Sequence, residues 1–173
     1  AGAQENLFDR NSVAIGDSTL YSNGNGTQYY HSTFNTATGA RSMLFNTTGF
    51  YNSAFGGHAL RKNTVGHRNT GIGFSALQNN TGGIYNTALG VEALNTNVTG
   101  SGNTALGYRA GANAVGFANV FIGQTAGSAE LGDEKLYIDN SPTSQPLIYG
   151  DFATDSMVVH GKLAFTVDGT GPA

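Results

Sequence analysis

The stretch "YNTALGVEALNTNVTGSGNTALGYRAG", residues 85–111, contains the phrase Asn-Thr-Ala-Leu-Gly twice, beginning at Asn86 and at Asn103. Variants of the phrase begin at equal intervals before it, "NTGIG" at Asn69, "NSAFG" at Asn52 and "NTATG" at Asn35, and "NVFIG" at Asn119 follows after an interval one residue shorter. "SVAIG" at Ser12 fits as a first copy, separated from the second by a longer insert. A fixed period of this kind indicates a repeat architecture before any local propensity is considered.

The aligned copies place the same residue types in the same columns. Each phrase ends in Gly, the residue before this Gly is usually large and apolar, and two residues earlier stands Thr or Ser with Ala or Gly between them. This alternation with a period of two predicts a short strand. A second short run follows ("GGHAL", "GFSAL", "GVEAL"), and then a polar turn such as "NTTG" or "NVTG". Each unit therefore predicts strand, bend, strand and turn.

A helical repeat is the competing interpretation, and the glycines argue against it. Each Gly inside a helix costs about 1 kcal/mol relative to Ala. Helical repeats also need about 33 residues or more per unit, roughly twice the period found here. The sequence therefore predicts an all-β fold, a parallel β-roll (β-solenoid) with coils of about 17 residues.

The organisation of the chain follows from where the repeat begins and ends. Residues 1–10 are expected to be a leader or remnant, and residues 11–130 to be the repeats with an insert at 21–33. Residues 131–173 contain "KLYID", "PLIYGDF" and "SMVVHGKLAF" and no further copy of the phrase. Because Pro142 and Pro146 would interrupt a coil, this segment is predicted to be a strand-rich cap or connector.

Stacking of coils gives the repeated columns a structural role. Identical side chains that lie one above another in register can form hydrogen bonds along the stack. The first residue of each phrase is therefore predicted to form a structural ladder: Asn35, Asn52, Asn69, Asn86, Asn103 and Asn119. The apolar column is predicted to be buried, either inside the roll or against another copy of the chain, and the chain to be a trimer: Phe55, Ile72, Leu89, Leu106 and Ile122.

Composition excludes several classes of protein. Charged residues make up 11% of the 173 residues and the net charge is −3, so the Lys/Arg clusters that nucleic-acid binding needs are missing. The chain has no Cys, which excludes disulfides and thiolate chemistry. No apolar run approaches the roughly 18 residues that a membrane span needs, so none is expected. The first residues, "AGAQ", are similar to the end of a signal-peptide cleavage site and favour an extracellular location.

The repeats resemble a known family. "NSVAIGDSTL" at residues 11–20 is similar to the signature of the YadA-like heads of trimeric autotransporter adhesins, and "NTALGxxAL" with its "NTTG" spacer is similar to the longer variant in bacterial surface and tail-fibre-like proteins. The similarity covers about residues 11–128. It implies a left-handed parallel β-roll and a homotrimer of three chains packed side by side. The last segment looks like the strand-rich part that precedes the C-terminal chaperone of some fibre proteins.

Motifs for catalysis or cofactor binding are weak in this sequence. "GIGFSA" at residues 71–76 imitates a nucleotide-binding loop, but both glycines lie at repeat positions. The four histidines show no metal-ligand spacing, the late acidic residues match no calcium loop, and no Ser has a visible His and Asp partner. The sequence predicts no metal, no cofactor and no enzymatic activity. The four Asn-x-Ser/Thr sequons, at Asn25, Asn46, Asn79 and Asn97, are expected by chance in so Asn- and Thr-rich a chain.

Two stretches depart from the repeat and supply the candidate ligand contacts. The insert carries Tyr29, Tyr30 and His31 among Gly, Ser and Asn, a mixture typical of recognition loops, although it also suits a cap over the edge of the first coil. "LRKNTVGHRN" carries Arg61, Lys62 and Arg68, which could hold an anionic glycan or could be a solvated turn.

These observations favour a non-enzymatic function. The leading interpretation is a structural and adhesive module of a bacterial or phage surface fibre, whose turns contact a receptor, a surface or a host glycan or protein. The alternative is an extracellular filament subunit whose coils stack end to end, because an open sheet edge is a template for pairing. An ice- or mineral-binding face is a third possibility, although Thr occurs once per strand beside apolar columns.

Overall fold

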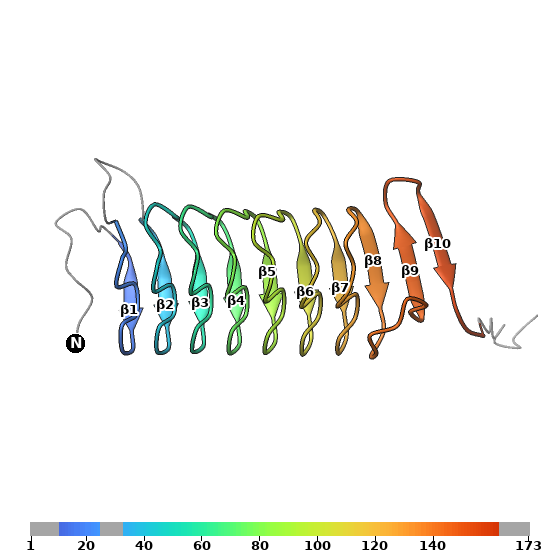
Figure 1. Cartoon of the computed structure of the whole chain (residues 1–173), viewed down its shortest axis with the longest axis horizontal. Coiled ribbons are helices and arrows are strands. Elements are labelled where there is room, and N and C mark those ends of the chain that lie inside the picture. Colours follow the sequence, from blue (N-terminus) through green and yellow to red (C-terminus); the bar gives the residue numbers. More distant parts are fainter. Residues whose placement is uncertain (1–10, 25–32, 163–173) are drawn as a thin grey trace, which may run out of the picture.

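The computed structural model describes residues 11–24 and 33–162, and within these ranges the protein forms ten strands and no helix. All ten strands belong to one sheet, in sequence order (Figure 1). The strands are β1 (Val13–Ile15), β2 (Thr36–Thr38), β3 (Ser53–Phe55), β4 (Thr70–Ile72), β5 (Thr87–Leu89), β6 (Thr104–Leu106), β7 (Val120–Ile122), β8 (Lys135–Ile138), β9 (Ile148–Asp151) and β10 (Ser156–Val159).

Strands β1 to β8 pair in parallel, each with the next strand along the chain. The register follows the repeat, because Thr70 pairs with Thr87 and Thr87 pairs with Thr104, one coil apart each time. The chain therefore winds as a β-solenoid whose coils match the period of the sequence, which confirms the predicted fold class. The parallel strands run downward in Figure 1, so the turn before each strand lies at the upper edge and the turn after it at the lower edge.

The C-terminal strands close this sheet in a different way. β8 lies inside the segment assigned to the cap, yet it pairs in parallel with β7 in the register of the preceding rungs, Val120 opposite Leu136. β9 and β10 then pair antiparallel to their neighbours. The change from coil to meander thus comes after Ile138, and the ion pair between Lys135 Nζ and Asp151 Oδ2, 2.9 Å long, joins the last rung to β9.

Glycine closes each strand because the next coil passes too close for a side chain. Gly90 has φ +143°, a conformation that L residues rarely adopt, and a Cβ built there would lie 2.2 Å from the carbonyl oxygen of Gly107. The other glycines of this column have φ between +117° and +136°, and a Cβ built at any of them would also lie closer than 3.0 Å to the backbone of the next coil. The Gly column therefore sets the spacing of the coils as well as the bend.

The wall opposite the sheet contains no assigned strand, yet backbone hydrogen bonds join its coils. Leu77 N donates to Ala93 O and Leu94 N donates to Ala110 O, both at 3.0 Å. Leu60, Leu77 and Leu94 have φ of about +50° and are fully buried. A leucine with positive φ is strained by roughly 1 kcal/mol or more, so burial and the hydrogen bonds between coils must hold this conformation.

The core is a narrow layer between the two walls. From β2 to β7 the middle residue of each strand points inward, and from β2 to β6 it is Ala or Gly. The opposite wall contributes Ser42 and Met43 in one coil and an Ala and a Leu in each of the next three coils. A Cβ built at Gly71 would lie 3.5 Å from Leu60 Cγ, so the leucines fill the space that these small residues leave. The close neighbour of these small residues is therefore the leucine column of the same chain.

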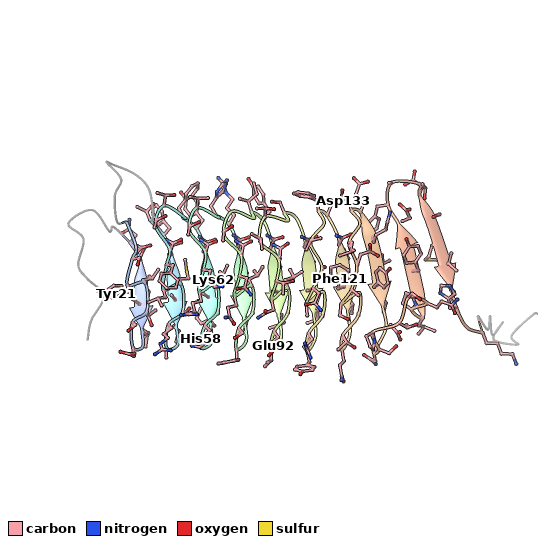
Figure 2. All side chains as sticks on the ribbon, in the orientation of Figure 1. Tyr21, His58, Lys62, Glu92, Phe121 and Asp133 are labelled. Atoms are coloured by element: carbon pink, nitrogen blue, oxygen red, sulfur yellow. The ribbon has the colours of Figure 1, made fainter. Side chains whose placement is uncertain are left out.

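The last two coils use the opposite arrangement. Gly111 and Gly127 replace the leucines, and Phe121 replaces the small residue at the centre of β7. Phe121 is fully buried, and Cβ atoms built at Gly111 and Gly127 would lie 2.5 Å and 2.1 Å from its ring. The large and small residues have exchanged walls, which keeps the core filled. Figure 2 shows Phe121 in this late part of the solenoid.

The asparagines that begin the phrases lie one above another at the start of the strands. The Oδ1 of each accepts a hydrogen bond from the backbone N–H of its counterpart in the next coil, as Asn69 Oδ1 does from Asn86 N at 3.0 Å. The same contact joins every pair of neighbours in this column, and the Nδ2 of each donates to the glycine carbonyl that ends its own coil. These side chains therefore tie the coils together and contribute nothing to the surface.

A second asparagine column, which the sequence reading missed, runs beside the first. Its members recur with the same period but stand inside the polar turns: Asn46, Asn63, Asn80 and Asn97. Each Nδ2 donates to the Oδ1 one coil earlier and to the same glycine carbonyl that the first column uses, so Gly83 O accepts from both Asn69 and Asn80. Asn46 and Asn97 are fully buried here, which removes two of the four sequons from the folded surface.

Candidate binding surfaces

The outer face of the sheet presents two columns of side chains. One column is mostly Thr, and the other is the apolar column of the sequence analysis. Four of its members are half exposed, Phe55 41%, Ile72 37%, Leu89 43% and Leu106 45%, and Ile122 is partly buried. The prediction that this column is buried inside the roll is therefore wrong, because its side chains alternate with the inward-pointing alanines. Burial against another copy of the chain stays a prediction.

The apolar character of this face continues past the glycine bends. The residue after each bend is exposed and large in three successive coils: Phe74, Val91 and Tyr108. Isolated apolar side chains are normal on a protein surface, but monomeric proteins rarely expose a contiguous apolar patch of more than a few hundred Å². Two neighbouring apolar columns along one side of the rod are typical of a surface that another molecule covers.

A second surface lies on the opposite edge, in the turn that precedes each strand. We call it the aromatic ridge, and its members are Phe34, Phe50, Tyr51, His67, Arg68 and Tyr85. Asp133 occupies the corresponding turn of a later coil and lies at the upper edge in Figure 2, whereas His58 and Glu92 lie at the lower edge. The ridge residues just before the asparagines have φ of 55° to 58°, a left-handed conformation that directs their side chains to solvent.

The ridge is ordered by ring stacking and by one arginine. The rings of Phe34 and Tyr51 stack with centroids 5.1 Å apart, and those of Phe50 and His67 stack at 4.5 Å. The Arg68 guanidinium lies 5.4–5.7 Å from the ring centroids of Phe50, Tyr51 and Tyr85, and its Nη1 donates to Tyr85 Oη at 3.0 Å. Cation–π contacts of this kind contribute roughly 0.5–1 kcal/mol each at exposed sites, so three of them restrict the position of the guanidinium.

The candidate ligand residues of the sequence analysis do not form one group. Arg61 and Lys62 lie in the wall opposite the sheet, where the Arg61 guanidinium packs over the Phe45 ring at 5.4 Å and its Nε is buried without a partner. Arg68 belongs to the ridge instead. Tyr29, Tyr30 and His31 lie outside the described residues, so their role as cap or contact stays a prediction.

At the lower edge, the positive charge of an arginine is neutralised by a neighbouring carboxylate. Arg109 Nε lies 3.2 Å from Glu92 Oε2, and the Arg109 guanidinium also lies over the Tyr108 ring at 6.0 Å. Partial burial, and then the positive charges of Arg61 and Arg41, lower the pKa of His58. Tyr108 and Arg109 are the same two residue types as Tyr85 and Arg68 of the ridge. Unlike Arg68, however, Arg109 is paired with the carboxylate of Glu92.

A small cavity of about 260 Å³ separates the last coil from the connector between β8 and β9. Glu130 and Tyr137 meet in its wall, where Tyr137 Oη donates to Glu130 Oε2, and Glu130 Oε1 accepts from the N–H groups of Leu131 and Gly132. Burial and the carboxylate raise the pKa of Tyr137, so the phenol keeps its proton. The carboxylate is fully engaged by the chain itself, which makes this pair a structural closure of the last coil.

The described residues hold no group of His, Cys, Asp or Glu side chains that could bind a metal ion. Among these residues there is also no helix with the length and apolar character needed to cross a membrane. Comparison with protein-family models, with curated proteins and with solved structures finds no match. The two surfaces, sheet face and ridge, are therefore the features on which a function can be proposed.

Proposed function

We propose that the protein is a non-enzymatic structural and adhesive module, a rod-like segment of an extracellular bacterial or phage fibre in which three copies pack through their outer sheet faces. The observation that carries this proposal is the half-exposed apolar column along β3 to β6. An apolar face repeated on every coil offers each copy the same contact along the whole rod, and full burial of one leucine adds on the order of 1–2 kcal/mol. The resemblance of the repeats to adhesin heads favours three copies.

A rod of this kind suits adhesion because it presents the same turns several times. The coils stack about 4.8 Å apart, so turn residues of neighbouring coils form a dense row on each edge. Weak contacts at each copy then act together, and the overall affinity gains from multivalency without a stronger single site. Most buried side chains of the described residues are packed in the core or hydrogen-bonded in the asparagine ladders, which favours a binding role over a catalytic one.

The test is the mass of the protein in solution, measured at several concentrations by sedimentation, with Leu89→Asp as the variant. Leu89 is 43% exposed and points away from the core, so the variant should keep its β-sheet circular dichroism and melt as a folded chain while the trimer dissociates. The matched control is Asn113→Asp, an exposed polar position in the wall opposite the sheet, which should stay trimeric. A monomeric wild-type protein, or a mass that grows without limit as in an end-to-end filament, would contradict the proposal.

A further inference from the structure

In the part of the chain that the structure describes, Arg68 of the aromatic ridge is the arginine that contacts three rings, whereas Arg61 and Arg109 contact one ring each. Only two ion pairs occur among the described residues, Arg109 with Glu92 and Lys135 with Asp151, so Arg68 has no carboxylate partner there. Its guanidinium is nevertheless fixed by three rings and by Tyr85 Oη. A guanidinium has five N–H donors, and the exposed Arg68 uses one of them for this hydrogen bond, which leaves donors for a bound anion.

The ridge stops beside Tyr85 and leaves an open step. The next coil has Gly102 at the position of Tyr85, and a Cβ built there would meet only the backbone of Ala118, at 3.7 Å. The step therefore spans two rungs, about 10 Å, between Tyr85 and the coil that carries Ala118 and the exposed Phe117. Tyr85 is 55% exposed beside this step, and an exposed aromatic ring is a surface on which a sugar ring can stack.

The geometry points to the aromatic ridge as a binding site for an acidic glycan. The phenol of Tyr85 and the open step would contact a sugar ring, and Arg68 would bind its carboxylate or sulfate group. Charge complementarity supports this occupant, because Arg68 is a positioned cation without a carboxylate partner among the described residues. The inference rests on the adhesive part of the proposed function and does not require a particular number of copies.

The chain contains its own matched control for this site. Tyr108 and Arg109 form the same pair of residue types on the lower edge, but Glu92 neutralises Arg109 at 3.2 Å. If exposed tyrosine and arginine were sufficient, both pairs would bind acidic glycans equally. If an unpaired and ring-held guanidinium is needed, only the ridge binds them.

The experiment measures binding of three probes to the full chain by calorimetry: a heparin-derived octasaccharide, a hyaluronan octasaccharide and the neutral maltooctaose. We expect one or both acidic probes to bind, with an affinity that falls as salt rises, and the neutral probe to bind at least tenfold more weakly. Arg68→Gln and Tyr85→Ala should each weaken acidic-probe binding about tenfold or more, since a charge-assisted contact and a stacked ring are each strong enough for that. Arg109→Gln, on the lower edge, should leave it unchanged.

Three results would overturn the inference. The first is no binding of either acidic probe to the wild-type protein, and the second is equal weakening by the ridge variants and by Arg109→Gln. The third is a change of mass in solution for Tyr85→Ala, which would make the ridge a contact between copies. If Arg68→Gln fails to fold, Arg68→Lys keeps the charge but loses the planar group that stacks on the rings, and it should weaken binding while the melting temperature holds. Because mass and glycan binding are separate readouts, failure of the trimer leaves this result interpretable.

Discussion

The coils between residues 35 and 100 repeat one core arrangement, whereas the coils between residues 103 and 138 change it in two places. In the core, two changes compensate each other: the large Phe121 replaces a small residue of the sheet, and Gly111 and Gly127 replace leucines of the opposite wall. In the second asparagine column no neighbouring residue compensates the change. Ala114 stands one period after Asn97, where the column would have its next Asn, and leaves the buried Asn97 Oδ1 without a hydrogen-bond donor. The comparison teaches that neighbouring coils compensate the departure in the core, whereas the departure in the asparagine column leaves one buried oxygen without a partner.

The largest effect should come from removing Phe121, the large residue of the exchange between the two walls. Phe121→Ala removes a fully buried ring, and we expect the free energy of unfolding to fall by about 3–5 kcal/mol. Adding Gly111→Leu and Gly127→Leu to this variant restores the arrangement of the regular coils and should recover part of the loss. Urea denaturation at one fixed protein concentration measures both changes.

The control for this prediction is Phe117→Ala, on the same coil. Phe117 is 48% exposed, so its removal should change the stability by less than about 1 kcal/mol. If the triple variant were less stable than Phe121→Ala alone, the exchange of large and small residues between the two walls would not explain the core of these coils.

An intermediate effect should distinguish the intact part of the second asparagine column from its interrupted end. Asn63→Ala removes donors to Asn46 Oδ1 and Gly66 O and the acceptor of Asn80 Nδ2, whereas Asn97 has no partner on its Oδ1 to lose. A lost buried hydrogen bond costs about 1–2 kcal/mol. We therefore expect Asn63→Ala to lower the free energy of unfolding by about 1–2 kcal/mol more than Asn97→Ala, measured by urea denaturation; equal losses would contradict the ladder.

The smallest effect should come from restoring an asparagine at position 114, where Ala114 interrupts the second asparagine column. Ala114→Asn places an amide beside Asn97, and its Nδ2 can donate to the unpaired Oδ1, so the free energy of unfolding should rise by about 1 kcal/mol. Ala114→Leu has a similar size and no donor, and it serves as the control. The melting temperatures of the two variants measure the difference, and stabilisation by Leu as large as that by Asn would assign the effect to packing instead of to the hydrogen bond.

The candidate ligand residues show which part of a binding site could be predicted from the sequence. It placed Arg68 among the possible ligand contacts because basic residues gather between 61 and 68, but it grouped Arg68 with Arg61 and Lys62, which the fold puts on another wall. It did not single out Phe34, Tyr51 and Tyr85, although these residues share one repeat position. Residues one full period apart in the sequence lie next to each other in the stacked coils, whereas residues along one coil lie on different walls. Comparing the residue types at each repeat position would therefore have identified the ridge.

The sequence by itself determined the period, the all-β solenoid and the ladder position of the phrase asparagines, because a short and regular repeat with a glycine at a fixed place permits few other folds. The tertiary structure decided which way the columns face. Alternation along a strand shows that Leu89 and Ala88 point to opposite sides, but only the position of the opposite wall, with its buried leucines, shows that Ala88 is inside and Leu89 outside. The side of a strand that becomes the core depends on which wall packs closest, and that is a property of the whole coil.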